Sequence, residues 1–162
     1  MSDRMIMLTL TRIEAGHLAD LIAQFTDLVN ATPAETDPAI ERLAPDAYPE
    51  DPDASREFRS LTRGDLLHRR AHEAAIVKRA LEALEPVDGT DADFSPADIA
   101  IPEDQIDAWL RTLTAVRLVI ANRLGIASED DHDPSDPRFG VYDWLGFRLD
   151  GLVQAADALR GD

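Results

Sequence analysis

The chain has 162 residues and no cysteine, and its 32 acidic residues against 16 basic ones give a formal net charge of −16. The lack of cysteine excludes disulfides, thiolate catalysis and cysteine-ligated metal centres. The length suits one domain, no apolar run reaches the roughly 18 residues of a membrane helix, and no leader-like segment opens the chain. We therefore expect one cytoplasmic domain over residues 1–162.

The N-terminal part of the chain predicts one helix. Residues 5–10 are short and apolar, which is compatible with a strand, but the sequence offers no obvious partner for it. Thr11 and Glu14 have the spacing of a capping box, in which each side chain accepts a hydrogen bond from the other residue's backbone N–H. Apolar residues then recur at helical spacing and predict a helix over about 12–30.

The middle of the chain predicts three more helices. One Asp-Pro pair opens a short helix over about 38–43, and a second opens a helix over about 52–61. Thr62 and Asp65 resemble another capping box, so a separate helix is expected over about 63–84.

The C-terminal half predicts a central helix. The segment 85–101 is rich in Pro, Gly and Asp and is expected to be a flexible acidic loop. The next helix, about 102–124, is apolar on all sides in its C-terminal half, so it should be the buried centre. A second flexible acidic loop is expected over 127–140, before a last helix over about 142–159. We predict an all-α bundle of about four long and two short helices around the central one.

The charge is distributed unevenly along the chain. The segment 56–79 holds seven basic and three acidic residues, a net charge of +4, so the rest of the chain carries −20. Such a segment is usually a solvated helix face paired with nearby acids; the alternative is a docking face for an acidic protein partner. The candidate docking residues are Arg56, Arg59, Arg63, Arg69, Arg70 and Arg79.

No arrangement of residues indicates catalysis or metal binding. His68 and His72 have the spacing of a two-histidine site, but a third ligand is missing and the neighbouring arginines repel a cation. Asp131 and Asp133 begin like a calcium loop, but its glycine and closing glutamate are absent. We expect no enzyme activity, cofactor or metal. The alternative is a small-ligand-binding protein or an enzyme with a pocket near Arg117.

Arg117 stands inside the apolar stretch of the predicted central helix. A guanidinium cannot lose its charge to escape burial, and an unpaired buried charge is costly, so we expect a structural ion pair. The expected partner is Glu57 or Asp143, each of which stands next to a large aromatic residue.

Four strings carry a resemblance to a known family. They are Arg-Leu-Ala-Pro-Asp-Ala-Tyr at 42–48, Glu-Phe-Arg-Ser-Leu-Thr at 57–62, Trp-Leu at 109–110 through Arg-Leu-Gly-Ile at 123–126, and Val-Tyr-Asp-Trp-Leu-Gly at 141–146. In this order they resemble the actinobacterial AosR-like family of domain-of-unknown-function proteins, over about residues 6–155.

The resemblance implies a non-enzymatic regulator or adaptor that acts through a protein partner in transcriptional or proteolytic control. Family members are usually encoded beside the ClpS adaptor, and the characterised stress regulator works with a sigma factor, so a sigma factor or a Clp-pathway component is the implied partner. That regulator senses oxidants through a cysteine pair, which this chain lacks. Because the chain is so acidic, we expect no direct contact with nucleic acid or membranes, and a homodimer is left open.

Overall fold

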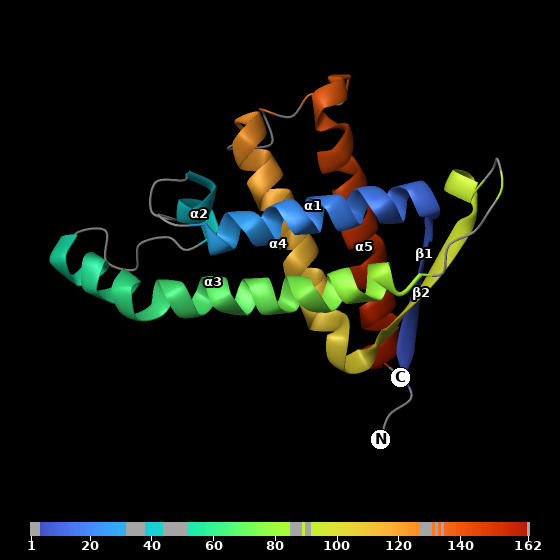
Figure 1. Ribbon diagram of the computed structural model, residues 1–162, viewed down its shortest axis with the longest axis horizontal. Coiled ribbons are helices and arrows are strands. Elements are labelled where there is room, and N and C mark those ends of the chain that lie inside the picture. The colour runs from blue at the N-terminus through green and yellow to red at the C-terminus, as the bar shows by residue number, and fades with distance from the viewer. Residues whose placement is uncertain are drawn as a thin grey trace.

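The computed structural model describes residues 4–31, 38–43, 52–84, 89, 92–126, 131, 133 and 135–161, apart from the side chains of residues 41, 52 and 54–63. This part of the chain is mostly helical and contains a small sheet (Figure 1). Its elements are β1 (Met5–Thr11), α1 (Arg12–Asn30), α2 (Pro38–Leu43), α3 (Pro52–Glu82), β2 (Pro96–Pro102), α4 (Ile106–Leu124) and α5 (Gly140–Gly161), with single 3-10 turns at Ala92–Phe94, Glu103–Gln105 and Pro137–Phe139.

The sheet corrects the prediction of a purely α-helical fold. Strands β1 and β2 pair antiparallel, with Met5 opposite Pro102 and Thr11 opposite Pro96. One face of the pair is buried and consists of Ile6, Leu8, Leu10, Ala97, Ile99 and Ile101. Residues 96–101, predicted as the end of a flexible loop, are therefore a strand. The pattern was hard to find because this strand is short and begins and ends with proline.

Helix α3 joins two predicted helices. The segments 52–61 and 63–84 are continuous from Pro52 to Glu82, so the predicted cap at Thr62 is wrong. A threonine and an aspartate are also tolerated inside a helix, and an internal glycine such as Gly64 costs only about 1 kcal/mol. The result is one 31-residue helix that runs across the molecule (Figure 1).

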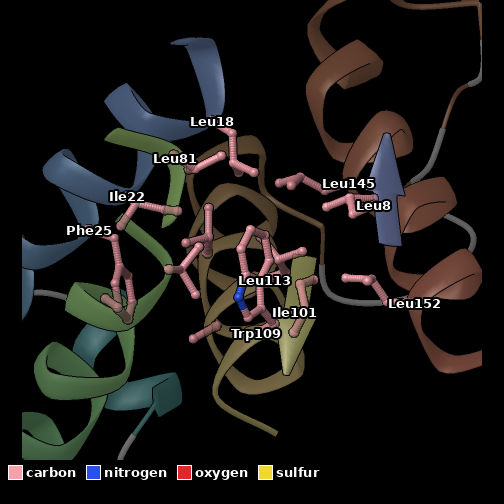
Figure 2. Close-up of a cluster of buried hydrophobic side chains, with 14 of the residues drawn as sticks. Leu8, Leu18, Ile22, Phe25, Leu81, Ile101, Trp109, Leu113, Leu145 and Leu152 are labelled. Atoms are coloured by element: carbon pink, nitrogen blue, oxygen red, sulfur yellow. The ribbon is translucent and has the colours of Figure 1, made fainter. Parts of the chain in front are cut away.

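Helix α4 packs against each of the other helices of the described chain. Trp109 and Leu113 of α4 lie between side chains of α1 and of α5 (Figure 2). Helices α1 and α3 run across α4 and α5 rather than alongside them, so the layout is a pair of crossed helix layers with the sheet at one end (Figure 1).

Helix α4 differs from the prediction in where it begins and in how deeply its C-terminal half is buried. The helix begins at Ile106 rather than at residue 102, because Pro102 is the last residue of β2. Near its other end, Leu118, Val119 and Ile120 are only half-buried, so the C-terminal half is not enclosed on all sides. These side chains line surface hollows instead.

Candidate functional site

Half of the predicted docking residues have described side chains. Arg69 and Arg79 of α3 are exposed, as are His68 and His72 of the same helix. The side chains of Arg56, Arg59 and Arg63 lie outside the described residues.

Arg70 differs from Arg69 and Arg79 because it is partly buried and bound to a neighbouring carboxylate. Its Nη1 donates to Oε1 of Glu73 at 2.8 Å, and Nη1 of Arg111 on α4 donates to the other oxygen at 2.9 Å. The Glu73 side chain is only 8% exposed. These two hydrogen bonds join the three charges into one cluster between α3 and α4, and the bond to Glu73 raises the pKa of Arg111.

Arg117 also joins two helices, and its described contacts are with Tyr142. Its Nε donates to the backbone carbonyl of Tyr142 at 3.1 Å, and its Cζ lies 3.7 Å from the centre of the Tyr142 ring. The predicted ion pair stays a prediction, because the Glu57 side chain lies outside the described residues; Asp143, the other predicted partner, is the residue after Tyr142. An aromatic face and a carbonyl both stabilise a cation, so Tyr142 helps to hold the half-buried guanidinium.

Gly146 leaves room for the contact between Arg117 and Tyr142. A Cβ at Gly146 would lie 2.9 Å from Nη2 of Arg117, whereas a Cβ at Gly151, on the same helix, would meet nothing within 4 Å. Alanine in place of an unconstrained helical glycine normally stabilises by about 0.5–1 kcal/mol. We expect Gly151→Ala to show this gain and Gly146→Ala to show less or a loss, because Arg117 must move off Tyr142.

Urea denaturation of the two alanine variants checks this expectation. In an Arg117→Ala background, Gly146→Ala should recover the gain seen at Gly151. Equal gains at both positions in the parent chain would mean that Arg117 moves aside without cost.

A second charged cluster surrounds Glu14 where α1 begins. The predicted capping box is confirmed, since Thr11 N–H donates to Glu14 at 2.9 Å and Glu14 N–H donates to the Thr11 hydroxyl at 3.2 Å. Two side chains of α5 also donate to the carboxylate, Trp144 at 2.5 Å and Arg148 at 3.0 Å. Neither residue was predicted to contact Glu14, although their four-residue spacing places them on one side of a helix.

The environment of Glu14 keeps its carboxylate charged. Burial opposes ionisation, but hydrogen bonds from the Thr11 backbone, Arg148 and Trp144 outweigh it and lower the pKa to about 2. Arg148 also donates to the Thr9 carbonyl of β1 at 3.4 Å. The Glu14 cluster therefore holds β1, α1 and α5 together.

The surface hollows of the described part of the molecule include three between helices. One of about 400 Å³ lies between α1 and α5 beside Trp144, one of about 450 Å³ lies between α1 and α4, and one of about 290 Å³ lies between α2, α3 and α4. Arg117 lines none of the three, so they give no support to a ligand pocket there. Within the described ranges, no group of three or more His, Asp and Glu side chains is placed to hold a metal ion.

Similarity to known proteins identifies the family of the chain. No helix in the described segments combines the length and apolar character needed to cross a membrane. The comparisons with curated proteins and with solved structures gave no match. One family model, described as Domain of unknown function (DUF2017), matches residues 1–156. This match covers nearly the whole chain, and the chain therefore belongs to the family Domain of unknown function (DUF2017).

Proposed function

We propose that the protein is a non-enzymatic adaptor or regulator of the cytoplasm that binds an acidic segment of a protein partner along α3. The observation that carries the proposal is the exposure of Arg69 and Arg79 on this helix, in a chain whose net charge is −16. At 100° per residue, Arg69, His72 and Arg79 fall within about a quarter of the helix circumference. They therefore lie on one side of α3, where one partner segment can contact them together.

The charge of the rest of the protein adds selectivity. An acidic partner is repelled over most of the surface and attracted to α3, so its orientation is restricted. Association of this kind should be fast at low ionic strength and weaken as salt is added.

The resemblance to AosR-like proteins supplies the finer part of the proposal. It favours stress-linked control of transcription or proteolysis, with a sigma factor or a Clp-pathway component as the partner. Because the chain has no cysteine, we propose that its regulation depends on binding rather than on thiol oxidation.

A charge-reversal experiment tests the proposal. The double variant Arg69→Glu/Arg79→Glu should lose a partner that the parent protein captures from its native cytoplasm at low salt. Arg138→Glu/Arg160→Glu is the matched control, because it changes two exposed arginines of other segments and alters the net charge equally. The captured partner is then purified and its affinity for all three proteins is measured. Equal binding by both double variants would place the docking surface elsewhere.

A further inference from the structure

The hollow between α2, α3 and α4 brings together three arginines that are far apart in the sequence. Arg42 comes from α2, Arg70 from α3 and Arg111 from α4, and the space they line has a volume of about 290 Å³. The remaining lining residues are mostly apolar: Leu43, Leu110, Thr114, Ala115 and Leu118.

The Glu73 carboxylate balances only part of this charge. It binds one nitrogen of Arg70 and one of Arg111, and Arg42 donates through Nη1 to the carbonyl oxygen of Ile126 at 3.2 Å. These three guanidinium groups and this carboxylate sum to a charge of +2, in a protein that is strongly negative overall, and Asp107, which also acts on Arg111, is hydrogen-bonded to Arg160.

Each of these guanidinium groups retains donors. Arg42, Arg70 and Arg111 use Nη1 in the contacts above, and their Nη2 groups make no hydrogen bond to the residues that the structure describes. Guanidinium N–H groups of this kind suit carboxylate and phosphate oxygens, which accept two parallel hydrogen bonds.

The apolar walls indicate what the anionic group is attached to. Leu43, Leu110 and Leu118 are each half-buried, so they are accessible to a ligand that enters the hollow. A free inorganic anion would leave these side chains in contact with water. An anionic group on a short apolar body would cover them.

We infer that this hollow binds an organic oxyanion, whose carboxylate or phosphate group contacts Arg42, Arg70 and Arg111 and whose apolar part lies on the leucines. The inference does not depend on the proposed function, because the docking surface on α3 is formed by Arg69 and Arg79. A chain could have either site without the other.

The test is an NMR titration of the full-length, isotope-labelled protein at constant ionic strength. The probes are butyrate and butyl phosphate, which distinguish a carboxylate from a phosphate, with butanol as the neutral control. We expect saturating chemical-shift changes at residues 42–43, 70 and 110–118 with at least one anion and not with butanol. Acetate and inorganic phosphate should bind at least several-fold more weakly, since they lack the apolar part.

Two pairs of variants make the result decisive. Thr114 is exposed and lines the hollow, so Thr114→Glu should raise the Kd at least tenfold by placing a carboxylate there, and Thr114→Gln should not. Arg42→Gln should weaken binding similarly, and Arg138→Gln, at an exposed arginine outside the hollow, should leave it unchanged. No saturating response to either anion, or a response that Thr114→Glu leaves intact, would overturn the inference.

Discussion

Glu14→Gln should lower the free energy of unfolding by about 2 kcal/mol at pH 7, and this difference should disappear as the solution is acidified. Glutamine keeps the size of the side chain and its ability to complete the capping box. It loses the charge that Arg148 contacts at 3.0 Å. Its amide NH2 also cannot accept the hydrogen bond from Trp144, so the effect measures the ionic contact and this hydrogen bond together.

The direction and size of this change in the free energy of unfolding follow from the pKa of Glu14. Folding lowers this pKa from 4.5 to about 2, so the charged form is favoured in the folded state. The stabilisation is complete above pH 4.5 and is lost as the pH falls toward 2. A shift of that size corresponds to at most about 3 kcal/mol, and the 24% exposure of the side chain reduces it.

Urea denaturation at a series of pH values, down to the lowest at which the parent stays folded, measures this difference. Glu82→Gln is the matched control, because Glu82 is exposed and its contact with Lys78 is long, at 3.7 Å. We expect that control to change stability by less than about 0.5 kcal/mol at any pH. A Glu14→Gln effect of the same size at pH 3 and pH 7 would show that the charge of Glu14 is not what stabilises the protein.

The Glu14 cluster also shows which contacts a local sequence pattern can predict and which it cannot. The capping box was predictable because Thr11 and Glu14 are three residues apart and their contact is within one turn. The contacts with Trp144 and Arg148 cross 130 and 134 residues, and no periodicity reports such a distance. They depend on how α5 is placed beside β1 and α1.

The same limit explains the two main differences in the fold. The boundaries of α1 and α2 follow from caps and spacing and agree with the prediction. The sheet depends on pairing between β1 and β2, which are about 90 residues apart; residues 5–10 were compatible with a strand, but their partner is not recognisable from neighbouring residues. The apolar residues on all sides of the C-terminal half of α4 predicted burial, but several of their side chains are half-exposed and line surface hollows.

The burial and partners of the charged side chains were the hardest features to predict from the sequence. Arg117 attracted attention because its sequence neighbours are apolar, and it does join α4 to α5, through Tyr142. The buried carboxylate of the described core is Glu73, which the sequence analysis counted among the charges of a solvated segment. Its spacing from Arg70 was a usable signal, whereas Arg111 comes from another helix.

Glu73→Gln should therefore lower the free energy of unfolding by about 2–3 kcal/mol. Breaking a buried ion pair typically costs about 3–5 kcal/mol, because the remaining charge is left without a partner. Here the cost is smaller, since the Arg111 side chain is 54% exposed and can turn toward water. Arg70 is 24% exposed and has less freedom to do so.

A paired replacement separates the loss of the contact from the cost of an unpaired charge. If the unpaired Arg70 guanidinium causes most of the loss, Glu73→Leu/Arg70→Leu should be more stable than Glu73→Leu alone, because only Arg111, which is 54% exposed, is then left without its partner. Denaturation of the parent and these variants gives the comparison. If the double variant were the less stable of the two, packing of the Arg70 stem would be the larger contribution.

The Glu73→Gln variant also separates structure from binding. Its loss of one negative charge leaves the hollow between α2, α3 and α4 more positive, so stability falls while affinity for butyl phosphate should stay equal or rise. Circular dichroism and the NMR titration, carried out on the same sample well below its melting temperature, measure the two properties together. A parallel fall in stability and affinity would mean that Glu73 is needed to position the arginines, and would identify it as a positioning residue for the hollow.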